Sequence, residues 1–92
     1  YTPEDYDSRK KYPLILAFHG ARSNARDMAP FTGFNEIANR EKFIVVYPYG
    51  TTDSKEPMFF WNAWECCGYA VNQKIDDIGF VKKLIRVMKE DY

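Results

Sequence analysis

The stretch PLILAFHGARSN, residues 13–24, decides the fold, because an apolar run of strand length ends abruptly at His19 and Gly20. Runs that are apolar on both faces are typical of a central parallel strand that helices cover on each side. A second run of this kind, FIVVYP, occupies residues 43–48. We therefore predict two parallel strands, over residues 13–18 and 43–48.

Two segments carry apolar residues at helical spacing. Between the strands, apolar residues at i, i+3 and i+4, beginning at Phe34, predict a helix over about residues 32–41. A second helix is predicted over residues 75–90, where acidic residues at the start and basic residues toward the end suit the helix dipole. Its apolar stripe, which we expect to lie in the core, is Ile78, Val81, Leu84, Ile85 and Met88.

The order strand, helix, strand, long loop, helix is typical of an α/β layer with a parallel sheet. Because two parallel strands need cover on both faces and both edges, the pattern predicts a third strand beyond residue 92. Residues 1–92 are thus expected to form a single, partial α/β domain. The connection over residues 51–74 is rich in aromatic residues and too apolar for a disordered segment, which favours a functional loop.

Composition and charge exclude several classes of function. Of the 92 residues, 46% are hydrophobic and 17% aromatic, and 13 basic side chains balance 13 acidic ones. A net charge of zero gives no field that favours nucleic acid or an anionic membrane surface. No apolar run approaches the roughly 20 residues that a membrane span needs. We therefore expect neither nucleic acid nor a membrane as a partner.

The chain has one histidine, His19, and it lies at the end of the first predicted strand, which makes it a candidate catalytic base. A Ser-His-Asp triad needs a serine beside a general base, but none of the three serines stands in G-x-S-x-G, the turn that exposes a nucleophile. A glycine after the strand suits a sharp turn that points the next N–H into the cleft. We therefore predict that Ala21 supplies one oxyanion-hole N–H, with His19 and Gly20 as scaffold. The alternative is a plain strand-to-helix turn with His19 bonded to backbone.

Two further pairs of residues have both a functional and a structural interpretation. Asp76 and Asp77 begin the last predicted helix, and we favour helix caps and dipole partners over paired carboxylates or metal ligands. Cys66 and Cys67 are adjacent, and no other Cys or His stands at ligand spacing, so we expect no metal site. Adjacent cysteines seldom bond to each other, so we expect a disulfide from Cys66 or Cys67 to a partner outside this chain, or free thiols.

Aromatic and basic side chains in the loops are candidate binding residues. Trp61 and Trp64 are compatible with stacking on an aromatic or sugar ring of a substrate, and equally with packing inside the protein. Arg22, Asn24 and Arg26 follow the first strand, where they either line the entrance to a cleft or are solvated loop residues.

Five motifs occur in order along the chain: PLILAFHG, TGFNEIA, FIVVYPYG, a tryptophan loop with CCGYA, and IDDIGFVKKLI. In this order and spacing the sequence resembles the polyhydroxybutyrate depolymerase-like and feruloyl esterase family of α/β-hydrolases. That family has an apolar strand into HG, then TGFN, a strand ending in VVYP-G, a tryptophan loop often with CCG, and a DDVGF helix. The resemblance covers residues 12–92.

The resemblance implies a secreted, extracellular serine esterase that acts on a polyester or on plant cell-wall esters and needs no cofactor or metal. In the family, the nucleophile, acid and histidine all follow the DDVGF helix. The chain is therefore expected to be an N-terminal portion, truncated before the nucleophile elbow and inactive alone, that supplies the oxyanion loop and one wall of the cleft. The alternatives are a non-catalytic hydrolase-like module that binds a carbohydrate or aromatic ligand through the aromatic loop, and a redox or metal protein built on the paired cysteines.

Overall fold

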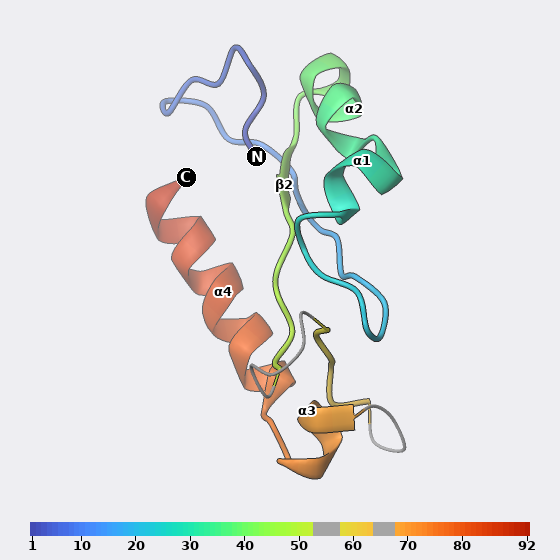
Figure 1. Cartoon of the computed structure of the whole chain (residues 1–92). Coiled ribbons are helices and arrows are strands. Elements are labelled where there is room, and N and C mark those ends of the chain that lie inside the picture. The colour runs from blue at the N-terminus through green and yellow to red at the C-terminus, as the bar shows by residue number, and fades with distance from the viewer. Residues whose placement is uncertain (53–57, 64–67) are drawn as a thin grey trace.

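A computed structural model of the chain describes residues 1–52, 58–63 and 68–92 (Figure 1). The described residues combine helices with a two-stranded parallel sheet, so the predicted α/β class is confirmed at this coarse level. In this part of the chain, no helix has both the length and the apolar character that crossing a bilayer requires. The elements are β1 (Leu14–Leu16), α1 (Met28–Thr32), α2 (Phe34–Glu41), β2 (Ile44–Val46), α3 (Gly68–Asn72) and α4 (Asp77–Asp91).

β1 and β2 pair in parallel, as predicted, with Leu14 opposite Ile44 and Leu16 opposite Val46. Both strands are shorter than the predicted ranges. The last ladder bond runs from the N–H of Ala17 to the carbonyl of Val46, at 2.9 Å. Beyond it the backbones no longer bond directly to each other, and a histidine side chain joins the two strand ends.

The described helices pack closely on one side of the sheet only. On one side, α1 and α2 pack on a small core of buried side chains, which are Ala17, Ala38, Phe43 and Val45. Figure 1 shows α4 on the other side of β2 from α1 and α2. Because α4 does not pack closely against the strands, this second side of the sheet is only partly covered, and all three residues of β1 remain half-buried.

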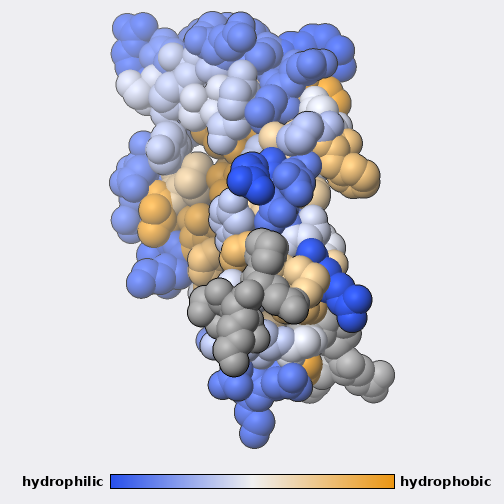
Figure 2. All heavy atoms as spheres, in the orientation of Figure 1, coloured by the Kyte–Doolittle hydropathy of each residue, from blue (hydrophilic) through white to orange (hydrophobic). Residues whose placement is uncertain are grey.

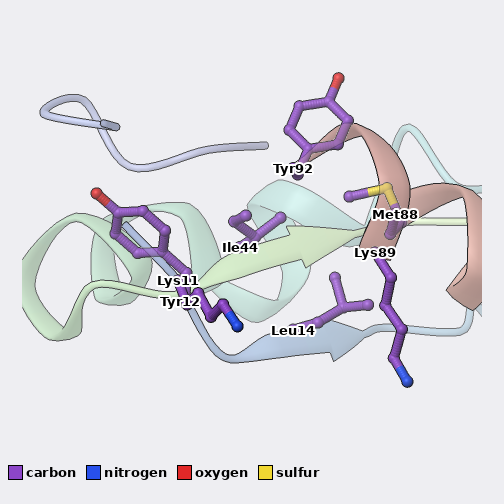
Figure 3. A pocket seen from close by; sticks show the side chains of 7 residues that line it. All are labelled: Lys11, Tyr12, Leu14, Ile44, Met88, Lys89 and Tyr92. Carbon is purple, nitrogen blue, oxygen red and sulfur yellow. The ribbon is translucent and has the colours of Figure 1, made fainter. Parts of the chain in front are cut away.

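α4 lies beside the sheet without a buried side chain. Between the end of α4 and the strands is a groove of about 390 Å³, where Met88 and Tyr92 face Leu14 and Ile44 (Figure 3). Figure 2 shows apolar residues exposed along this helix. The prediction that the α4 stripe lies in the core is wrong, because no other described helix or strand packs closely against α4. Ile78 is 68% exposed, and the other four residues of the stripe are only partly buried.

The helix boundaries follow from local backbone chemistry. The helix predicted over residues 32–41 begins at Phe34, because Gly33 adopts a left-handed φ of 67° and separates α2 from α1. The cap interpretation is confirmed for Asp76, whose carboxylate accepts the N–H of Gly79 at 3.0 Å. Asp77 lies in the first turn of α4, as predicted for a partner of the helix dipole, and its carboxylate also accepts the N–H of Asn62 at 2.6 Å.

Candidate functional site

The loops that follow β1 and β2 meet at one edge of the sheet. Ligands of parallel α/β sheets bind beyond the carboxyl ends of the strands, which makes this edge the first place to look for a site. An extended segment crosses both loops there, through antiparallel bridges from Phe59 to Ser23 and from Phe60 to Thr51. We call the residues gathered at this edge the strand-end site: His19, Gly20, Ala21, Gly50 and Trp61.

His19 is the centre of the strand-end site and is only 2% exposed. The N–H of Gly50 donates to its Nε2 at 2.9 Å, so Nε2 has to be the acceptor and Nδ1 carries the proton. Nδ1 then donates to the carbonyl of Gly20, at 2.7 Å. Because both ring nitrogens of the neutral imidazole are engaged, the ring joins the two strand ends and has no free nitrogen to accept a proton.

Trp61 packs against His19 from the crossing segment. Its indole N–H donates to the carbonyl of His19 at 2.9 Å, and the two rings lie 5.1 Å apart. The ring also meets Phe18 edge-on at 5.2 Å and Phe80 of α4 at 6.5 Å. These contacts favour packing over substrate stacking for Trp61. Three other candidate residues, Trp64, Cys66 and Cys67, lie outside the described residues.

Ala21 is exposed, and its N–H has no hydrogen-bond partner among the described residues. Both neighbouring amides are bonded: the N–H of Arg22 donates to the carbonyl of Phe59 at 3.0 Å, and that of Ser23 donates to Gly20 at 3.2 Å. The hydrogen bonds of Arg22 and Ser23 therefore fix the loop directly after Ala21, whose own N–H has no partner among the described residues. A free, fixed backbone N–H is the geometry that stabilises a developing oxyanion.

The turn at the strand-end site does not depend on Gly20 as the sequence suggested. Gly20 has no left-handed backbone, and a Cβ built there would meet nothing within 4 Å. The left-handed residue of the loop is Arg22, with φ of 66°. The glycine that the site requires is Gly50, where a Cβ would lie 2.8 Å from the carbonyl carbon of Phe60. The sequence marks Gly50 only as the stop after the second strand.

Beside the strand-end site is a cleft of about 440 Å³ lined by Asn24, Arg26, Tyr49 and Phe59. Tyr49 is 50% exposed and its ring lies 5.0 Å from that of Phe59. Two of the three predicted entrance residues, Asn24 and Arg26, thus line this cleft, while Arg22 lines another one. In residues 1–52, 58–63 and 68–92, no group of three or more His, Cys, Asp or Glu side chains is placed to hold a metal ion.

Two substitutions of His19 distinguish the contribution of its hydrogen bond to stability from the contribution of its packing. His19→Phe keeps a ring between Trp61 and Phe59 but leaves the Gly50 N–H buried without an acceptor, which is expected to lower the free energy of unfolding by about 1–3 kcal/mol. His19→Ala also leaves a cavity and is expected to cost about 2–5 kcal/mol. Urea unfolding followed by tryptophan fluorescence measures both. If His19→Phe were as stable as the unsubstituted chain, the hydrogen bond would not be holding the strand ends together.

Comparisons of the chain with models of protein families, with curated proteins and with solved structures find no match. Function is therefore inferred from the strand-end site itself.

Proposed function

We propose that this chain is the N-terminal portion of a secreted serine esterase of the α/β-hydrolase type, with the N–H of Ala21 as one oxyanion-hole donor. The observation that carries the proposal is this N–H, which bonds to no described residue and lies in a fixed loop at the carboxyl end of a parallel strand. The motif order that resembles polyhydroxybutyrate depolymerase-like and feruloyl esterases supports the same assignment. Polyesters and plant cell-wall esters are the proposed substrates.

The proposed chemistry is acyl transfer through a covalent intermediate. A serine attacks the ester carbonyl, and the tetrahedral oxyanion accepts hydrogen bonds from Ala21 and from a second donor after the nucleophile. A donor of this kind is effective because it is already in place and needs no reorganisation when charge develops. The bond from Arg22 to Phe59 and the bonds of His19 provide that rigidity. The reaction needs no metal ion and no organic cofactor.

The catalytic base of this enzyme is not His19. Both of its ring nitrogens are engaged, and to accept a proton at Nε2 it would have to give up a buried bond from Gly50. The chain has no second histidine. The proposal therefore requires a nucleophilic serine, an acid and a histidine from a segment outside these 92 residues.

The reading frame of the natural gene tests this requirement directly. We expect it to encode, within about 200 residues after residue 92, a G-x-S-x-G turn followed by Asp or Glu and then His. Purified full-length protein should release acid from a small ester and should be inactivated by a serine-directed phosphonate. A frame that ends without these three groups would rule the esterase out.

A second candidate, a non-catalytic module, is favoured by the aromatic cleft. Tyr49 is half-exposed over Phe59, which offers a flat apolar surface to a sugar or aromatic ring. This candidate predicts that the purified 92-residue chain unfolds cooperatively and binds an oligosaccharide or aromatic ester without hydrolysing it. Tyr49→Ala should abolish that binding, whereas Tyr6→Ala, which removes a tyrosine of the N-terminal segment, should leave it unchanged.

A further inference from the structure

A second cleft, of about 500 Å³, lies between the extended segment and α3, and no step of the proposed reaction uses it. Its apolar wall is formed by Met58 and Phe60. The polar side chains that line it come from α3, from the turn after it, and from the loop that follows β1: Tyr69, Asn72, Gln73 and Arg22. The cleft therefore combines a flat apolar surface with several hydrogen-bond donors.

The polar side chains of this cleft are not used by the fold. Within the described part of the chain, Arg22 and Arg86 are in no ion pair, and of these two only Arg22 lines a cleft. The Tyr69 hydroxyl and the carboxamides of α3 and the following turn likewise have no hydrogen-bond partner among the described residues. One guanidinium, one phenol and two carboxamides are thus free to bind a ligand.

The backbone at Arg22 is held in a conformation that disfavours an L-residue. Its φ is 66°, and the bond from its N–H to Phe59 at 3.0 Å keeps it there. Glycine adopts this conformation without strain. Two other described non-glycine residues share it, but Lys42 caps α2 and Lys74 follows α3, whereas Arg22 lies in the strand-end loop. Strained positions cluster at functional sites.

From these observations we infer that the cleft binds a carboxylate-bearing small molecule, with the Arg22 guanidinium on the carboxylate. A guanidinium matches the two oxygens of a carboxylate with two parallel N–H bonds. Among the described residues that line the cleft, Arg22 is the one charged side chain, and its charge is positive. That charge suits a singly charged carboxylate better than a doubly charged phosphate. Phe60 and Met58 cover the body of the ligand, and Tyr69 bonds its further oxygens.

This inference does not depend on the esterase assignment, because it concerns binding and not turnover. If that assignment also holds, the carboxylate would lie next to the oxyanion donor, since Arg22 directly follows Ala21. The enzyme would then select esters whose acid or alcohol part carries a second, ionised carboxyl group.

Titration of the full-length protein with matched charged and neutral compounds tests the inference. Benzoate is compared with benzamide, and glucuronate with glucose, by calorimetry and by the NMR shifts of the Arg22 Nε–H and the Tyr69 ring. We expect one acid to bind about tenfold to a hundredfold more tightly than its neutral counterpart. Preference for benzoate identifies an aromatic ligand, and preference for glucuronate identifies a sugar acid. Equal binding of acid and neutral compound, or tighter binding of inorganic phosphate, would overturn the inference.

Variants at Arg22 distinguish the effect of its charge on ligand binding from its effect on folding. Arg22→Gln is expected to abolish the preference for the acid, and Arg22→Lys to retain only part of it, because an ammonium lacks the planar fork. Arg22→Gly removes the strain as well as the charge, so it should fold at least as well and still lose the preference. Arg86→Gln, at an exposed position of α4 outside the clefts described above, is the matched control and should bind like the unsubstituted protein. Retained preference in Arg22→Gly would overturn the inference, whatever the outcome for the esterase.

Discussion

In the complete esterase, Ala21→Pro is expected to lower kcat by about 10²–10³-fold, the usual effect of removing one oxyanion donor. Proline has no N–H, so the substitution removes the donor itself. The fold should tolerate it, because the Ala21 N–H bonds to no described group and the residue is exposed. Its φ is also not left-handed, unlike that of Arg22, and so is compatible in sign with the fixed φ of proline.

The matched control is Ala21→Ser, which changes the side chain and keeps the N–H. It should retain most of the activity, and both variants should unfold at a similar urea concentration. Because an oxyanion donor acts in the transition state, Ala21→Pro should reduce kcat much more than it changes KM. A correctly folded proline variant with nearly full kcat would show that Ala21 is not the donor.

Gly50→Ala is expected to lower the free energy of unfolding by about 3 kcal/mol, the upper end of what overpacking a tight site costs. The new Cβ would lie 2.8 Å from the carbonyl carbon and 3.1 Å from the nitrogen of Phe60, and both are backbone atoms that cannot turn away. Moving either chain breaks the bridge between Thr51 and Phe60 and lengthens the bond from Gly50 to His19. For a domain of 92 residues, such a loss is a large share of the total stability.

Gly20→Ala is the control for Gly50→Ala, because the substitution is the same and the two glycines belong to the same site. At Gly20 a Cβ meets nothing within 4 Å, so the free energy of unfolding should change by no more than about 0.5 kcal/mol. Urea unfolding of the two variants side by side gives the comparison. Equal destabilisation would mean that the crossing segment does not pass against Gly50 as closely as described.

The sequence was sufficient for those parts of the fold that local pattern controls. Two continuous apolar runs predicted β1 and β2 and their parallel pairing, and the structure confirms both. The carboxylate of Asp76 at a helix start predicted a cap, which is confirmed. The five-residue α3 was missed, because it lies within a long connection without helical periodicity. The split between α1 and α2 was missed because it depends on one left-handed glycine, Gly33.

The candidate site was only half predictable. The sequence pointed to His19, Gly20 and Ala21 as one loop, and to Trp61 without placing it. The contact that organises the loop, between His19 and Gly50, joins residues 31 positions apart, and no periodicity carries information about such a pair. Nor does a pattern of residue types show that a separate segment crosses both loops.

What the sequence by itself determined is therefore the alternation of strands and helices and the identity of the strand-end loop, because periodicity, breakers and caps act over a few residues. Tertiary structure alone decided that His19 is a bridge with both nitrogens bonded, and that the indispensable glycine is Gly50 and not Gly20. Among the residues that the structure describes, it also left the N–H of Ala21 without a hydrogen-bond partner and the guanidinium of Arg22 without an ion pair. Each of these depends on which distant backbone reaches a given atom, and only packing in three dimensions decides that.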